Sequence, residues 1–111
     1  MNIQTRIKFR VDEVLHFFQN KHGKTYKFPK IHYFCHPEDV GMAYPEDWII
    51  EFNTDYLASH PDMMIEEIIP HEVIHLIADT LQKPCESYHG RTWCKLMREF
   101  GLKPKAVYEF T

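Results

Sequence analysis

Two histidines and a glutamate stand at the spacing that zinc hydrolases use, in the segment IPHEVIH at residues 69–75. His71 and His75 are four residues apart, one helical turn, so their imidazoles would project from the same face. Glu72 is offset from His71 by about 100° around the helix axis, beside the pair. Two ring nitrogens can converge on one zinc ion while the carboxylate reaches a metal-activated water. The H-E-x-x-H pattern therefore predicts metal-assisted hydrolysis.

A catalytic zinc site needs a third protein ligand and leaves one coordination position open. His89 is the leading candidate, with thirteen residues between it and the second histidine of the motif. It lies in YHGRTW, where Gly90 would allow a close backbone path. The carboxylates of Glu86 and Glu99 are the alternatives. A metzincin pattern is excluded, because positions 78 and 81 hold alanine and leucine in place of glycine and histidine.

Two helices must carry these residues. Hydrophobic spacing predicts one helix over about 60–81, with Ser59 as its N-cap and Asp62 as the capping-box partner. Pro70 removes a backbone N–H inside that segment, which predicts either a kink or a new helix start. A last helix follows Gly90 and stops at Gly101, and its apolar stripe comprises Trp93, Leu96, Met97 and Phe100.

An N-terminal helix and a short sheet complete the expected elements. The helix is predicted by apolar residues at helical spacing before Gly23, namely Val11, Val14, Leu15 and Phe18. Between residues 24 and 53, short aromatic and β-branched runs separated by prolines (TYKF, IHYFC, GMAY, WIIEF) predict two or three strands. No repeat or linker divides the chain, so we expect one domain over residues 1–111. The sequence does not decide whether residues 102–111 dock.

Composition limits the classes of function. A chain of 111 residues suits one compact domain, and its net charge of -3 predicts no general attraction to nucleic acid or to anionic membranes. No apolar run approaches the roughly 20 residues that a membrane span requires. The chain start does not resemble a secretory signal, and an odd number of cysteines argues against a disulfide framework. We therefore expect a cytoplasmic protein without a membrane partner.

Longer blocks around the motif resemble the SprT-like zinc metalloprotease domain family, which includes the Spartan-type DNA–protein crosslink proteases. IPHEVIH followed by HGRTWCKLMREFG carries the resemblance, with GMAYPEDWIIEFNTDYL upstream, over about residues 41–104. It implies a minimal gluzincin-like core of α+β class: a small antiparallel sheet of about three strands with an N-terminal helix, an active-site helix and a C-terminal backing helix. It also implies that His71, His75 and His89 bind Zn²⁺ and that Glu72 is the catalytic glutamate.

The predicted function is a zinc-dependent metallopeptidase with Glu72 as general base and a protein or peptide as substrate. The alternative is a non-catalytic zinc-containing module that binds protein or DNA. Glu72 disfavours the module, because a structural zinc site closes its fourth position and needs no base. A zinc hydrolase acting on a non-peptide amide is a third hypothesis. The sequence leaves the oligomeric state open.

A basic segment, KHGKTYKFPK at residues 21–30, interleaves four lysines with Tyr26 and Phe28. Lysines beside aromatic rings can follow a phosphate backbone while bases stack on the rings. Many members of the family append a zinc ribbon, but this chain has no CxxC pair. A solvated loop is therefore the main interpretation. Nucleic acid as a partner, or cleavage of nucleic-acid-associated proteins, is the secondary one.

Other side chains could support the predicted centre. Asp79 lies one turn after His75 and either holds the second ring nitrogen of that histidine or faces solvent. The developing oxyanion needs a donor beyond zinc, and the candidates are Tyr44, Tyr88 and Arg91.

Overall fold

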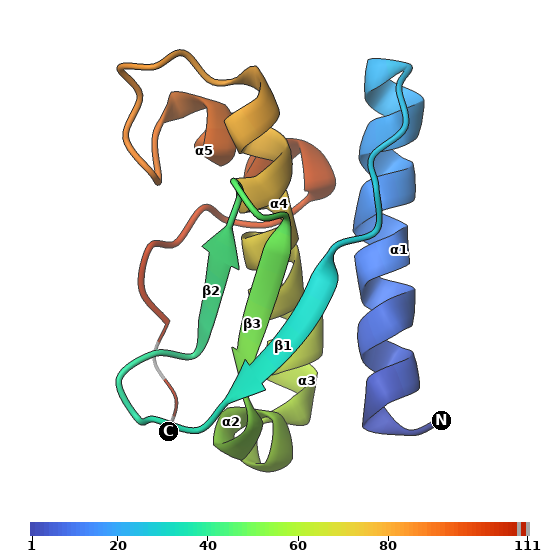
Figure 1. The fold of residues 1–111 in the computed structure, drawn as a ribbon, viewed down its shortest axis with the longest axis vertical. Helices are drawn as coiled ribbons and strands as arrows, with labels where there is room; N and C mark the ends of the chain where they lie inside the picture. Colours follow the sequence, from blue (N-terminus) through green and yellow to red (C-terminus); the bar gives the residue numbers. More distant parts are fainter. Residues whose placement is uncertain (109, 111) are drawn as a thin grey trace.

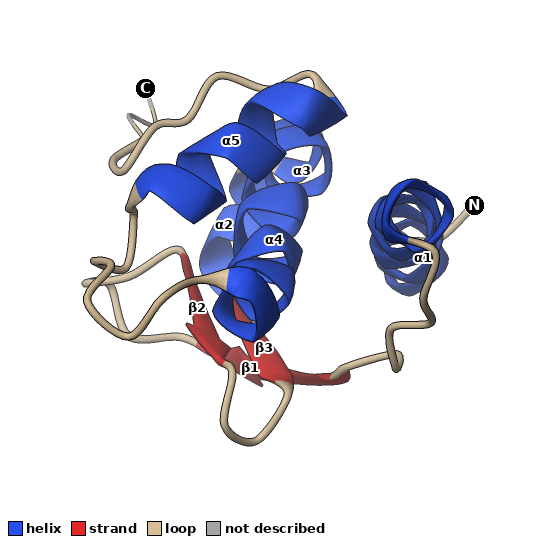
Figure 2. Cartoon of the chain, turned by 90° about the horizontal axis from the view of Figure 1, so that it is seen from above, coloured by secondary structure: helices blue, strands red, loops and turns tan. Residues whose placement is uncertain are grey.

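A three-stranded sheet forms one layer of the protein, and the helices lie on one face of it (Figures 1 and 2). The structure is a computed structural model and describes residues 1–108 and 110. Residues 109 and 111, which belong to the segment 102–111 whose docking the sequence leaves open, lie outside the described residues. The α+β class, the N-terminal helix and the C-terminal helix are confirmed.

The first helix, α1, spans Ile3–His22 and ends at Gly23, as predicted. The Asn2 side chain accepts a hydrogen bond from the N–H of Thr5 at 2.8 Å, which satisfies one of the unpaired donors of the first turn. Gly23 ends the helix with φ of 66°, a left-handed conformation that glycine adopts at little cost. The buried face of α1 includes the predicted apolar residues Val11, Val14, Leu15 and Phe18.

The strands are β1 (Lys30–Phe34), β2 (Gly41–Tyr44) and β3 (Ile49–Asn53), in the spatial order β1-β3-β2. A short turn pairs β2 with β3 in antiparallel fashion, whereas β1 runs parallel to β3. The sheet is therefore mixed, and the expectation of an antiparallel sheet is wrong for the β1–β3 pair. The reason is that residues 35–40 lead from β1 to β2, which does not pair with β1, and β3 then takes the central position between these two strands.

Asn53 holds this crossing segment. Its side chain is fully buried, and its amide donates to the carbonyl groups of His36 at 2.8 Å and Asp39 at 3.0 Å. Its side-chain oxygen accepts from the N–H groups of Asp55 and Tyr56, so the same residue caps the next helix. The end of β3, the crossing segment and the following helix are thereby joined at one point.

The segment expected as a single helix over about 60–81 consists of several helical pieces. These are α3 (Pro61–Met63), a π-helical turn η1 (Met64–Ile68) and α4 (Ile69–Leu81), and a separate short helix, α2 (Thr54–Ser59), precedes them. The prediction that Ser59 caps this segment is wrong. Ser59 ends α2, where its hydroxyl donates to the carbonyl of Asp55 at 2.9 Å, and His60 is the N-cap residue of α3.

The predicted kink at Pro70 takes the form of the π-helical turn. The N–H of Ile69 bonds to the carbonyl five residues back, and Pro70 has no N–H to offer the carbonyl groups of Ile65 or Glu66. Arg10 of α1 supplies both missing donors. Its Nε donates to the carbonyl of Ile65 at 3.1 Å, and its Nη2 donates to that of Glu66 at 2.7 Å. Helix α1 therefore supports the turn that precedes the metal motif.

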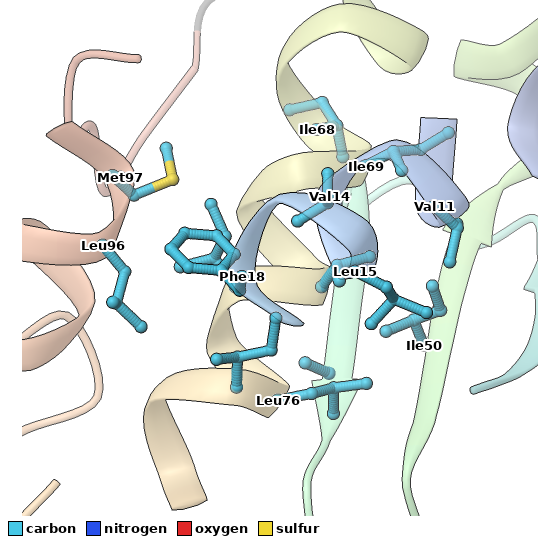
Figure 3. Packing of buried hydrophobic residues seen from close by; sticks show 14 of the residues in the cluster. Val11, Val14, Leu15, Phe18, Ile50, Ile68, Ile69, Leu76, Leu96 and Met97 are labelled. Carbon is cyan, nitrogen blue, oxygen red and sulfur yellow. The ribbon is translucent and has the colours of Figure 1, made fainter. Parts of the chain in front are cut away.

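Helix α4 runs through the centre of the protein, and every residue from 69 to 78 is buried. It packs between the sheet, α1 and α5 (Arg91–Phe100), as the labelled side chains of Figure 3 show. Burial of an aliphatic or aromatic side chain of this kind stabilises the fold by about 1.5–3 kcal/mol. The predicted stripe of α5 is confirmed, with Trp93, Leu96 and Met97 buried and Phe100 partly buried. The motif thus lies on a helix that packing holds on several sides.

No helix in the described part of the chain is both long and apolar enough to cross a bilayer.

Candidate metal site

Three imidazole rings converge at the side of α4. The Nε2 atom of His71 lies 3.2 Å from Nε2 of His75 and 3.2 Å from Nε2 of His89. Candidate ligand atoms of all three residues lie within 4.8 Å of one another. In a tetrahedral site with Zn–N bonds of about 2.0–2.1 Å, two nitrogen ligands are separated by roughly 3.3 Å. The three histidines are therefore positioned to bind one metal ion.

The two carboxylates considered as alternatives to His89 have other roles. Glu86 accepts hydrogen bonds from the N–H groups of Lys83 at 2.8 Å and Thr92 at 2.9 Å, so it closes the loop before α5 and caps that helix. Glu99 lies 3.7 Å from Lys21 in an ion pair between α5 and α1. Neither belongs to the group of residues that could hold a metal among those described.

Gly90 permits the loop that brings His89 to α4. A Cβ atom at this position would lie 2.7 Å from the carbonyl oxygen of Ser87, closer than a real side chain approaches. The N–H of Gly90 donates to that same carbonyl at 3.0 Å, so the turn is tight. The sequence prediction that Gly90 allows a close backbone path is confirmed.

Aromatic side chains hold the ring of His75. Tyr88 stacks on it with ring centroids 3.7 Å apart and an interplanar angle of 12°, and Trp93 lies nearly parallel to it at 5.0 Å. The indole Nε1 of Trp93 also donates to the backbone carbonyl of His71 at 3.3 Å. These contacts restrict the orientation of His75. Asp79 is exposed, as the solvent-facing alternative for this residue predicted.

Burial keeps the histidines neutral. It lowers the pKa of His71 to about 3, with a further contribution from His89, and lowers the pKa of His75 to about 2, with contributions from His71 and His89. Burial also lowers the pKa of His89. Neutral imidazole is the form that binds metals, so the three side chains are in a ligating state at neutral pH.

The carboxyl group of Glu72 lies between α4 and β2. Burial, with a smaller contribution from the charge of Asp39, raises its pKa to about 8. Gly41 of β2 makes room for this side chain, because a Cβ atom there would lie 3.0 Å from Oε2 of Glu72. A cation bound by the nearby histidines would lower the pKa of Glu72 again, since an opposite charge favours the carboxylate. Glu72 is therefore a buried carboxyl group of raised pKa next to the candidate metal site.

An open cleft of about 360 Å³ leads to these groups. The segment of residues 37–42 lines one side of the cleft, and Tyr88 and the described tail residues 106–108 and 110 contribute further lining. Of the three predicted oxyanion donors, Tyr88 lines the cleft, while Tyr44 donates to Glu51 at 3.0 Å and Arg91 is exposed.

Tyr108 is a site residue that sequence reasoning missed. Its hydroxyl lies 3.3 Å from Nδ1 of His71, although thirty-seven positions separate the two in the chain. No periodicity or motif marks this tyrosine, because it lies in the irregular segment after α5.

The two aromatic side chains of the basic segment at residues 21–30 differ in exposure. Tyr26 is buried, with Lys24 Nζ 5.4 Å from the centroid of its ring. Of the two aromatic rings in the segment, Phe28 is the exposed one.

Comparison with known proteins agrees with this geometry. Residues 11–109 match the SprT-like family. The protein named Protein SprT from Pseudomonas aeruginosa is 26% identical to this chain, and the alignment covers 98% of this chain and 64% of the relative. The Protein SprT of Pasteurella multocida is 25% identical, and the alignment covers 98% of this chain and 66% of the relative. The corresponding protein of Escherichia coli is 28% identical over 97% of this chain and 66% of its own. The chain thus spans less than two thirds of the length of these relatives, and no solved structure matches it significantly. A match that covers most of the chain, together with the three converging histidines, places this protein in the SprT-like family.

Proposed function

We propose that this protein is a zinc-dependent metallopeptidase. The observation that carries the proposal is the convergence of three histidines beside a buried glutamate of raised pKa, with Nε2 of His71 at 3.2 Å from Nε2 of both His75 and His89 and all three ligand atoms within 4.8 Å of one another. His71, His75 and His89 are the proposed ligands, and Glu72 is the proposed general base. Three imidazoles with an open fourth position are typical of catalytic zinc, whereas structural zinc sites are closed by a fourth protein ligand.

Bound zinc would supply Lewis acidity and lower the pKa of a water molecule to around 7. Glu72 would accept a proton from that water and later deliver it to the leaving amine. Its burial suits both steps, because a carboxyl group with a pKa nearer neutrality can accept a proton and return it. Tyr88, whose pKa is raised mainly by burial, stays protonated at the edge of the cleft and is the remaining oxyanion donor of the three predicted from sequence.

The position of β2 supports a peptide as the substrate. This strand lies at the edge of the sheet, and Gly41 and Met42 line the cleft beside Glu72. An extended peptide can pair with an exposed strand edge through main-chain hydrogen bonds. The free cysteines of the chain, of which Cys35 and Cys85 are exposed, fit a reducing compartment, so we place the activity in the cytoplasm.

The competing function is a zinc-containing module that binds a protein or DNA without cleaving it. The buried Glu72 and the open cleft favour hydrolysis, because a module gains nothing from burying a carboxyl group beside its metal. The two functions make different predictions for one mutant, Glu72→Gln.

In the test, wild-type protein, Glu72→Gln and the matched control Glu46→Gln, which changes an exposed glutamate, are each loaded with zinc. They are incubated with an unfolded protein substrate, with and without single-stranded DNA, and with and without a chelator. We expect about one zinc per chain in all three by elemental analysis, and cleavage that falls by about 10²- to 10⁴-fold in Glu72→Gln alone. Full activity of Glu72→Gln would remove this residue from the mechanism. Stoichiometric binding by the wild type without any fragments would support the module.

A further inference from the structure

The segment after α5 returns to the metal site. It leaves the helix at Gly101, where the N–H of Leu102 donates to the carbonyl of Met97 at 2.9 Å, and runs back across α4 (Figure 1). Tyr108 in this segment lines the cleft and lies over His71, with ring centroids 5.4 Å apart and an interplanar angle of 70°. The hydroxyl oxygen of Tyr108 is 3.3 Å from Nδ1 of His71.

Phe110 anchors the segment on the far side of Tyr108. Its ring centroid lies 4.7 Å from that of Tyr56 on α2 and 5.1 Å from that of His60. On the near side, Lys105 places its Nζ atom 5.9 Å from the centroid of the Tyr108 ring. Contacts on both sides therefore hold the hydroxyl group beside His71.

The metal geometry determines the direction of the hydrogen bond at His71. Its Nε2 atom faces the other two histidines, so a metal ion would take the lone pair of Nε2. A neutral imidazole that coordinates through Nε2 carries its proton on Nδ1. Nδ1–H then donates, and the hydroxyl oxygen of Tyr108 accepts. Within the described part of the chain, no other hydrogen-bond partner approaches this nitrogen.

We propose that Tyr108 is a positioning residue of the metal site, which holds His71 in the tautomer and ring orientation needed for coordination through Nε2. This inference rests on the proposed function, because it assumes that His71 binds the metal. A partner on the second ring nitrogen fixes the tautomer of a ligating histidine and raises its basicity. Removal of such a partner typically weakens metal binding or activity by about 10- to 100-fold. The segment after α5 is then part of the metal centre.

The test compares Tyr108→Phe, which removes the accepting oxygen and keeps the ring, with the control Tyr56→Phe. Tyr56 lines the same cleft and packs on the same anchor, Phe110, but contacts none of the proposed ligands. Zinc dissociation constants are measured by competition with a chelating dye. We expect zinc binding about 10- to 100-fold weaker in Tyr108→Phe. Tyr56→Phe should bind zinc as the wild type does.

A second readout separates positioning from a general effect on the fold. In zinc-loaded wild type, the Nδ1–H proton of His71 should be visible by NMR and protected from exchange with water. In Tyr108→Phe this proton should exchange faster, while the thermal unfolding of the metal-free protein changes little. Equal zinc affinity and equal proton protection in wild type and Tyr108→Phe would overturn the inference alone. Absence of zinc binding by the wild type would overturn the proposed function as well.

Discussion

Replacing Arg10 by methionine removes the two donors that serve the carbonyl groups at the Pro70 kink, and keeps most of the apolar stem of the side chain. The bonds from Nε to Ile65 and from Nη2 to Glu66 measure 3.1 and 2.7 Å. A hydrogen bond to a charged group contributes about 1.5–3 kcal/mol, and the lower end applies here because the bond to Glu66 is exposed. We expect the free energy of unfolding to fall by about 2–4 kcal/mol.

A double-mutant cycle with Pro70→Ala isolates the proposed cause. Alanine restores an N–H at position 70, which can donate to one of the two carbonyl groups that Arg10 serves. Arg10→Met should therefore cost less in the Pro70→Ala background than in the wild type. The difference should be about one hydrogen bond, or about 1 kcal/mol.

Urea unfolding of the four proteins without metal, at one pH, measures this coupling. Arg6→Met is the matched control on the same helix, because Arg6 pairs at 2.9 Å with Asp62, whose side chain is 82% exposed. An exposed ion pair of this kind contributes about 1 kcal/mol at most, and it should not couple to Pro70→Ala. If the effects of Arg10→Met and Pro70→Ala add within about 0.5 kcal/mol, Arg10 does not act through the kink and the reasoning is refuted.

Two further predictions concern the groups beside the metal. Without metal, His71 and His75 have pKa values of about 3 and about 2, below the ordinary 6.5, so the unfolded state binds more protons and stability falls as the pH drops below about 6.5. Glu72 has a pKa of about 8, above the ordinary 4.5, so the folded state binds more protons and the contribution of Glu72 to stability is lost as the pH rises from 4.5 to about 8. Below pH 6.5 the proton uptake of two histidines on unfolding exceeds the proton release of one carboxyl group, so the free energy of unfolding should be largest near that pH. Urea unfolding in the presence of a chelator measures this profile. A free energy of unfolding that stays constant between about pH 5 and 8.5 would contradict the assigned protonation states. In Gly41→Ala, the new Cβ would lie 3.0 Å from Oε2 of Glu72 and would displace that carboxyl group. We expect the rate of peptide hydrolysis to fall about tenfold while the affinity for zinc is unchanged. An unaltered kcat would show that the position of this carboxyl group is not critical.

Helical periodicity was sufficient to predict which side chains share a face of α4. Residues four apart in a helix are neighbours whatever the rest of the chain does, so the pairing of His71 with His75 follows from local geometry. The apolar stripes of α1 and α5 were readable for the same reason. His89 is different: local spacing left it in competition with Glu86 and Glu99, and only its family context favoured it. In the fold neither carboxylate lies with the other two histidines, because Glu86 accepts hydrogen bonds in the loop before α5 and Glu99 pairs with Lys21.

The order of the strands was not accessible from the runs of apolar residues. Such runs indicate that strands exist, but not which strand lies in the centre, and the parallel pairing of β1 with β3 depends on the path of residues 35–40. That path is held by the buried amide of Asn53, which contacts carbonyl groups up to 17 residues away in the chain. The same limitation explains why the N-cap was assigned wrongly to Ser59, since that residue is the last of the short helix α2.

The sequence by itself determined the chemistry that one helix can present, because the positions of two histidines and a glutamate within two turns are a matter of local backbone geometry. Tertiary structure alone decided what surrounds that helix. Arg10 reaches the kink from 55 residues away, and Tyr108 reaches His71 from 37 residues away. Contacts between residues so far apart in the chain depend on how complete elements pack, and no spacing rule within a single segment contains that information.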